Sequence, residues 1–406
     1  MLQKYLYILL LLICPAVSMQ ATDAQEAASQ LVGLGLENVR VATKGTETVY
    51  VAIEAASYRE TYRGAAVCLQ KLGELFPEVG TFRVMLIENQ MPQMALTATR
   101  ENGRWKLKGG YDYHDIDIAT RVTTVRNSSS GKMDLTVYPM VTLINHRLNQ
   151  VFEYVVSLAP TFETSLWKGN RITLQAVIPV SYDTESINNE TYPHVGIADV
   201  AQEITSPNGR WQAALAGGFF FFDRYGVDLR LGCHVTPRLT LGAEASCTGD
   251  AFVDYDGHYN FGKMKRFSYF GKVDYYEPYT LLQGQITGGR FVYGDYGVRG
   301  DISRHFGDYT IGVYGIWSEG ETNLGFHFAI PIGPKRQMRK GMLRLRMPHY
   351  FDWEYSMDSD DLKGDFYAKN KGGVVETRPD ENRSAHYWQP VHVAQYAEKI
   401  LNGDLK

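Results

Sequence analysis

The longest regular pattern in the chain is an alternation of apolar and polar side chains, which begins after Gly103 and continues to about residue 332. In residues 239–246 every second side chain is apolar, and the positions between them hold threonine, glycine, glutamate and serine. Residues 171–178 and 323–330 follow the same pattern. Since successive side chains of a β-strand point to opposite faces, the pattern predicts a large sheet with one apolar face and one small or polar face.

A soluble β-sandwich also alternates, so the period alone does not separate it from a membrane barrel. The runs at residues 132–146, 151–167 and 211–222 are longer than the ~5–6 residues of an ordinary strand and suit the ~9–11 residues of a spanning strand. Aromatic residues lie near the run ends, as an interfacial girdle requires; they are Trp167, Trp211, Phe219, Phe220, Phe221, Phe222, Tyr225, Tyr309 and Trp317. The sequence favours a transmembrane antiparallel β-barrel of about twelve strands over residues 103–333, with the secreted sandwich as the alternative.

Turn clusters separate these strands, as at residues 127–131, 168–170 and 206–209. Such Gly-, Asn-, Ser- and Pro-rich segments are typical of tight connections. Two longer loops are expected at residues 183–194 and 254–265, and the first is placed outside the cell.

Residues 23–100 have a different pattern, which predicts a small α+β module of order αββαββ. Apolar residues recur at three- to four-residue spacing after Asp23 and again over residues 62–76, where Pro77 ends the second helix. Each helix precedes two short alternating runs that are expected to form hairpins. Two helices can cover one face of such a sheet, so we expect the module to fold by itself.

The first residues have the features of an export signal. Lys4 precedes an apolar run over residues 6–13, and small residues at 16–18 form a cleavage site, so residues 1–18 are excluded from the fold. Cys14 leaves lipidation open as a minor alternative. Cys68, Cys233 and Cys247 remain in the mature chain; the last two could pair, or could pack as small residues.

Charge and composition narrow the range of partners. The net charge is −4 and the pI is near 6.2, so the chain lacks the basic excess that drives non-specific nucleic-acid binding. Residues 334–406 form a polar tail with a basic cluster over 335–346 and a short helix near 391–401. Because this tail follows the last apolar strand, we expect it in the periplasm together with the module.

No motif for a nucleotide, a metal or a nucleophile stands out, so neither a cofactor nor enzymatic activity is expected. His234 and His327 have no second histidine at metal-ligand spacing. A barrel-embedded hydrolase remains an alternative, because Ser303, His305 and Asp308 are close in sequence. A polar strand end explains these three residues more simply.

The polar face of the predicted barrel carries charges of both signs. A lumen lined in this way must be hydrated or filled by paired side chains. The residues expected to face it are Glu163, Arg171, Gln175, Asp228, Arg230, Glu244, Arg290 and Arg299.

Several stretches carry a resemblance to a known family. Residues 289–298 (GRFVYGDYGV), 303–307 (SRHFG), 311–314 (IGVY) and 324–331 (LGFHFAIP) resemble the YjbH family of exopolysaccharide-associated outer-membrane proteins. Residues 35–41 (GLENVRV), with Glu54, Tyr58 and Arg59, are similar to the periplasmic units that precede YjbH-type barrels. The proteobacterial members are longer and usually lipoproteins, and no functional residue of the family transfers position by position.

The resemblance implies a non-enzymatic outer-membrane protein that assists export or assembly of an exopolysaccharide or capsule. Its expected partners are outer-membrane lipid, polysaccharide and periplasmic export proteins, with no role for nucleic acid. The main alternative is an outer-membrane channel or secretion-system accessory unrelated to sugar.

Overall fold

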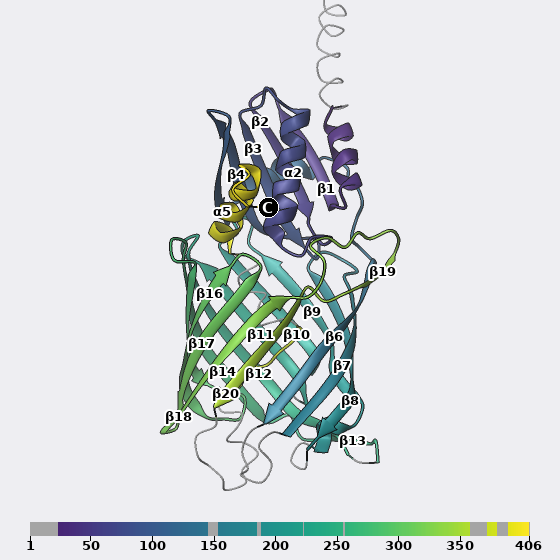
Figure 1. Ribbon diagram of the computed structural model, residues 1–406, viewed down its shortest axis with the longest axis vertical. Helices are drawn as coiled ribbons and strands as arrows, with labels where there is room; N and C mark the ends of the chain where they lie inside the picture. The colour runs from purple at the N-terminus through teal and green to yellow at the C-terminus, as the bar shows by residue number, and fades with distance from the viewer. Residues whose placement is uncertain are drawn as a thin grey trace, which may run out of the picture.

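The computed structural model describes residues 23–144, 153–184, 188–221, 223–254, 256–357, 372–379 and 389–405. The expected signal segment at 1–18 and Cys14 lie outside these residues. The chain is mainly β and forms two sheets, one of five strands and one of fifteen. Figure 1 shows the smaller sheet and its helices stacked on one end of the larger sheet.

The smaller unit combines residues from both ends of the described chain, and we call it the module. Residues 23–33 are helical. Its other elements are β1 (Glu37–Lys44), β2 (Thr48–Glu54), α2 (Thr61–Leu75), β3 (Thr81–Glu88), β4 (Met91–Glu101), β5 (Arg104–Gly110), α3 (His114–Arg121) and α5 (Pro390–Leu401).

The module's sheet has the order β1-β2-β3-β4-β5, with β2 and β3 parallel and the other neighbours antiparallel. Leu69 and Leu72 of α2 are fully buried against Phe82 of β3, and α5 adds Val393 to the same core. On the opposite face, Ile116 of α3 belongs to a smaller apolar cluster. The expected order αββαββ describes this unit through β4, but the sheet also includes β5 and the unit also includes α3 and α5.

The larger sheet contains the remaining strands, most of which are long. They are β6 (Met133–Ile144), β7 (Glu153–Thr164), β8 (Asn170–Asp183), β9 (His194–Thr205), β10 (Trp211–Phe220), β11 (Arg224–His234), β12 (Leu239–Val253), β13 (Tyr259–Phe261), β14 (Arg266–Glu277), β15 (Leu282–Arg290), β16 (Tyr296–Phe306), β17 (Tyr309–Ser318), β18 (Glu321–Pro331), β19 (Leu343–Arg346) and β20 (Tyr350–Met357). A 3₁₀ turn, η1 (Asn188–Thr191), lies between β8 and β9.

Two boundaries differ from the sequence expectation. Residues 104–110, assigned to the barrel region 103–333, form β5 of the module, and the larger sheet begins at Met133. Residues 334–406, expected to be a polar periplasmic tail, contribute β19 and β20 to the larger sheet and α5 to the module. The first error overlooks a local signal, because Asn102 and Gly103, both at positive φ, join β4 to β5 in a tight hairpin. The second depends partly on tertiary packing, because α5 joins the module through its contacts with α2 and β5.

The two ends of the larger sheet's strand order are adjacent in the chain. From β6 to β18 and then β20 each long strand pairs antiparallel with the next, whereas β19 pairs parallel with β6. Only residues 347–349 separate β19 from β20. Trp353 Nε1 of β20 donates to the carbonyl oxygen of Val141 in β6 at 2.9 Å. The sheet therefore wraps around, as its tilted strands do in Figure 1, and brings its first and last strands together.

Alternation divides the larger sheet into two chemically distinct faces. On β11, Leu229 and Leu231 are exposed on the outer face. Asp228, which directly precedes Leu229, lies on the inner face and is only 1% exposed. On β16, Ile302 is 57% exposed, whereas Ser303 is buried. Among the described residues, no helix is long and apolar enough to cross a membrane.

Candidate functional site: the inner face of the larger sheet

Ion pairs between strands line the inner face. Arg171 of β8 is 3.1 Å from Asp199 of β9, and both side chains are almost fully buried. Arg299 of β16 donates to both carboxylate oxygens of Glu354 on β20, at 3.2 and 2.8 Å. Its guanidinium also lies 4.0 Å from the ring centroid of Tyr314. Bidentate pairs of this kind fix both partners in position, so the inner face is preorganised.

A second group of charges lies on β11 and β12. Arg230 Nε is 2.8 Å from Asp228 and 3.4 Å from Glu244, and both carboxylates are buried. Two further predicted residues also find partners, because Glu163 lies 3.1 Å from Arg346 and Gln175 donates to the Thr161 hydroxyl at 2.8 Å. Seven of the eight residues expected to face the interior therefore make contacts there; they are Glu163, Arg171, Gln175, Asp228, Arg230, Glu244 and Arg299.

The eighth residue, Arg290, was assigned to the wrong face. It lies directly opposite Tyr269 on β14 and Tyr296 on β16 in the strand register, and directly paired residues share a face. Both tyrosines are more than half exposed, as is Ile286 on the same strand. Arg290 donates to the carbonyl of Phe267 at 2.7 Å, so it belongs to the outer rim of the sheet.

Several inner residues escaped the sequence analysis although the same period contains them. Ser268, Lys272 and Asp274 alternate on β14, and Asp274 accepts hydrogen bonds from Gln283 and Gln285 on β15. Their spacing of two or four positions was the available signal.

Residues 372–379 were not predicted to have any role, yet they lie against the inner face. We call them the inner segment. Val375 is 1% exposed and packs in a cluster with Ala201, Ala216, Phe220 and Val292. This segment has no periodicity, so no local pattern in the sequence could have placed it there.

The module covers one end of the inner face, and a buried carboxylate fixes it there. Asp308, in the turn between β16 and β17, accepts hydrogen bonds from Arg59, Tyr62 and Arg63 of the module. Burial would raise the pKa of Asp308, but the hydrogen bonds from Tyr62 and Arg59 and the charge of Arg63 outweigh it and hold the pKa below its usual range. Arg59 also donates to the carbonyl of Gly333.

A second buried carboxylate, Glu54 at the end of β2, joins β1, the β3–β4 turn and the connection between α3 and β6. It accepts hydrogen bonds from Asn38, from the Ser129 hydroxyl at 3.0 Å and from the backbone amide of Asn89 at 3.1 Å. Complete burial, with the nearby carboxylate of Glu37, raises its pKa to about 7 despite these donors. Glu54 and Arg59 both belong to the stretches that carried the family resemblance, and here they hold the structure together.

The residues of the hydrolase alternative do not assemble as a catalytic triad. His305 contacts Thr310 at 3.0 Å and Gln283 at 2.9 Å, whereas Asp308 is held by the module's arginines. Ser303 instead lies 3.3 Å from Nε2 of His327, but its hydroxyl donates to Asp301 at 2.8 Å. The same Nε2 of His327 faces Asp301 at 3.1 Å. A nucleophilic serine would donate to histidine, so this geometry does not activate it.

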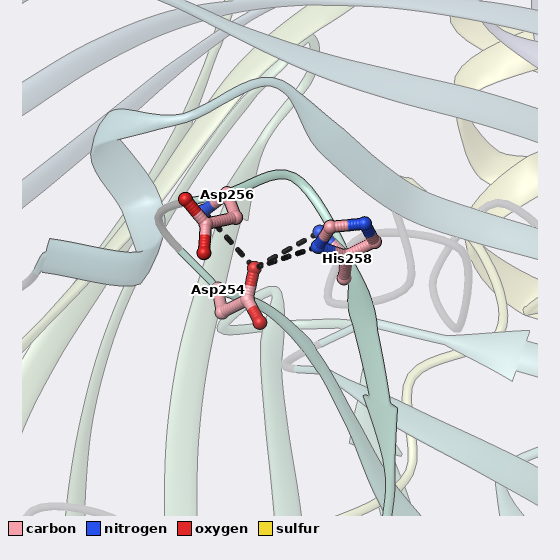
Figure 2. Close-up of side chains that lie close together, drawn as sticks. All are labelled: Asp254, Asp256 and His258. Carbon is pink, nitrogen blue, oxygen red and sulfur yellow. Dashed lines mark hydrogen bonds and ion pairs between the residues drawn. The ribbon is translucent and has the colours of Figure 1, made fainter.

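Three side chains at the tip of the β12–β13 hairpin could together offer ligand atoms to a metal; they are the partly exposed Asp254 and the exposed Asp256 and His258 (Figure 2). Asp254 Oδ1 accepts hydrogen bonds from the backbone amides of residues 256 and 258 at 3.0 and 2.9 Å. Carboxylates that accept from nearby amides in this way shape a turn. The cluster is therefore explained by the hairpin itself.

The cysteines are free among the described residues. Cys233 lies opposite Leu241 and Cys247 lies opposite Val227, so the two cysteines sit at different heights on β11 and β12 and do not meet. Comparison with models of known protein families gives no match, and no curated protein matches the chain.

Proposed function

We propose that the larger sheet is a closed barrel that spans a bacterial outer membrane. A sheet exposed to lipid must leave no unpaired edge, because an unsatisfied backbone group costs several kcal/mol in hydrocarbon. The succession of β19 and β20, the parallel pairing of β19 with β6, and the Trp353–Val141 hydrogen bond support closure.

Two belts of exposed aromatic residues carry this proposal. The belt nearer the module contains Trp167, Trp211 and Tyr309, and the belt at the remote end contains Tyr269, Tyr296 and Trp317. Tyr309 and Trp317 lie on the same strand, which gives a separation of about 26 Å at ~3.3 Å per residue. With a strand tilt of ~40°, the belts are about 20 Å apart along the membrane normal, close to the ~25 Å apolar band of outer-membrane barrels.

We further propose that the protein is not an enzyme and assists export or assembly of an exopolysaccharide or capsule, with the module in the periplasm as a docking site for an export protein. The resemblance to the YjbH family supports this role. So does the inner face, whose arginines, carboxylates and amides are suited to hydrogen-bond the hydroxyls of a sugar chain.

The membrane and polymer parts of the proposal are tested separately. An integral barrel stays in the membrane pellet after carbonate extraction and migrates faster in detergent gels before boiling than after it; release by carbonate would point to the secreted sandwich. Deletion of the protein should lower surface polysaccharide, and the wild-type copy should restore it. Unchanged surface polymer in the deletion strain would contradict the export role.

A further inference from the structure

The inner segment extends between the two ends of the larger sheet. At the remote end, Gly372 donates its amide to Asp295 at 2.9 Å, and the Val292 amide donates to the Gly373 carbonyl at 3.1 Å. At the module end, Arg378 reaches Glu88 of β3 and Glu203 of β9. The segment therefore lies along the passage that a polymer would follow through the proposed barrel.

Side chains of the barrel wall hold the middle of the segment. Arg230 Nη2 donates to the carbonyl of Val375 at 2.6 Å, and Arg171 Nη2 donates to the Thr377 hydroxyl at 3.3 Å. The Phe221 amide donates to the Glu376 carbonyl at 3.1 Å. Each accepting group is a carbonyl or a hydroxyl oxygen, for which the hydroxyl oxygens of a sugar are direct chemical substitutes.

The wall also has hydrogen-bonding capacity that the segment does not use. Nε and Nη1 of the buried Arg171 have no hydrogen-bond partner among the described residues. Buried donors of this kind normally find partners, so their presence beside Thr377 points to a further acceptor at this site. Residues 372–379 form no strand with the wall, so the segment is held by separate contacts and not by a continuous backbone ladder.

From these contacts we infer that Arg171, Arg230 and Asp295 form a binding track for an extended oligosaccharide, and that the inner segment occupies this track in the resting protein. The oligosaccharide binds when the segment leaves, and its hydroxyls take over the hydrogen bonds of Val375, Thr377 and Gly372. This inference rests on the proposed function, because it names the substrate class and its site.

A reversible disulfide tests whether the segment blocks the track. The hydrogen bond between Val292 and Gly373 places their backbones within the distance that a disulfide can bridge. The variant V292C/G373C, with Cys233 and Cys247 changed to serine, is purified as the full chain and placed in planar bilayers, with maltohexaose as the neutral sugar probe. We expect the oxidised form to carry no current, and the reduced form to carry a current that maltohexaose blocks.

Point variants give a second test that needs no engineered disulfide. Arg378→Ala removes the anchor at the module end and should increase the open fraction at least several-fold over wild type. Arg104→Ala, an exposed arginine on the module, should not change it. In the reduced disulfide variant, Arg230→Met should weaken the maltohexaose block about tenfold, the usual effect of losing one charged hydrogen bond.

The outcomes separate the inference from the proposed function. Equal current and equal sugar block in the oxidised and reduced forms, or no increase with Arg378→Ala, would overturn the binding track. If deletion leaves surface polymer unchanged while the current differs between the oxidised and reduced forms, the export role is refuted and the binding track is supported. If deletion lowers the polymer but the two forms carry the same current, only the binding track is refuted.

Discussion

Replacing Ile302 with arginine should destabilise the protein far more than its exposure alone would suggest. Ile302 lies on the outer face of β16 and is 57% exposed. Its partner on β17 is Val313, which is midway between the belt residues Tyr309 and Trp317. In the proposed barrel, Ile302 therefore faces the middle of the hydrocarbon.

The free-energy cost of each substitution depends on how deep the side chain lies in the proposed membrane. An arginine at the bilayer midplane of a barrel costs about 2–4 kcal/mol, and the cost falls to about 0–1 kcal/mol near the interface. We expect the larger cost for Ile302→Arg and the smaller cost for Ile311→Arg, which is equally exposed but lies beside Tyr309. Ile118 on α3 of the module is 54% exposed to water, so Ile118→Arg should change stability by less than about 0.5 kcal/mol.

The assay is denaturant unfolding of each variant in lipid vesicles, followed by tryptophan fluorescence and fitted to a free energy of unfolding. The expected order of destabilisation is Ile302→Arg, then Ile311→Arg, then Ile118→Arg. If the three substitutions have equal effects, the outer face meets water, and the membrane proposal is refuted together with the depth argument.

Three further predictions concern buried contacts. Because the folded state holds the Glu54 proton up to a pKa of about 7, against about 4.5 when unfolded, stability is fully present below pH 4.5 and falls by on the order of 3 kcal/mol as pH rises to 7. Thiol labelling of the buried Cys68 should therefore accelerate with pH more in wild type than in Glu54→Gln. Trp353→Phe should lower the free energy of unfolding by about 1–3 kcal/mol, because it removes the hydrogen bond between β20 and β6. On detergent gels, the faster-migrating folded form should then be lost at a lower temperature. Asp308→Asn should cost about 3–5 kcal/mol by leaving Arg59 buried without its charged partner, and should make the connection between α3 and β6 more accessible to protease.

Matched controls separate these effects from general damage. Trp167→Phe removes an exposed hydrogen bond to Gln202 and should cost less than Trp353→Phe. Asp115→Asn breaks a partly exposed ion pair with Arg83 and should cost at most about 1 kcal/mol. Equal losses in either pair of variants would contradict the importance given to burial, and a parallel pH response of wild type and Glu54→Gln would contradict the assignment to Glu54.

The sequence predicted the inner face well wherever period two alone decides the side. Arg171, Gln175, Asp228 and Glu244 fall on the buried face because alternation is local and survives into the folded sheet. Arg290 was misplaced because its charge was given more weight than its position, four residues after the exposed Ile286. Near a strand end the outer face also accepts polar groups, so charge is a poor guide there.

Some features were missed although the sequence carried a signal for them. In residues 350–357, Phe351, Trp353 and Tyr355 alternate with Asp352 and Glu354, and this strand was overlooked because it lies in an otherwise polar tail.

Residues 104–110 follow β4 through the tight turn of Asn102 and Gly103, so a local hairpin signal was overlooked there. The position of α5 could not be predicted in this way, because it packs on β5 nearly 300 residues earlier in the chain, where Leu107 donates its amide to Glu398.

The same long-range connections join the module to the inner face of the larger sheet. The chain leaves β20, passes along the inner face as residues 372–379, and ends in α5, which packs against α2 and β5 of the module. His392 of α5 hydrogen-bonds Tyr276 of the larger sheet at 2.8 Å, and Arg378 contacts Glu88 on the module as well as Glu203 on the sheet. If the inner segment leaves its track, the contact of Arg378 with both units must break. A protein that binds the module and moves β3 relative to β9 would therefore weaken the contacts that hold the segment, which would give the proposed periplasmic partner a physical means of opening the proposed passage.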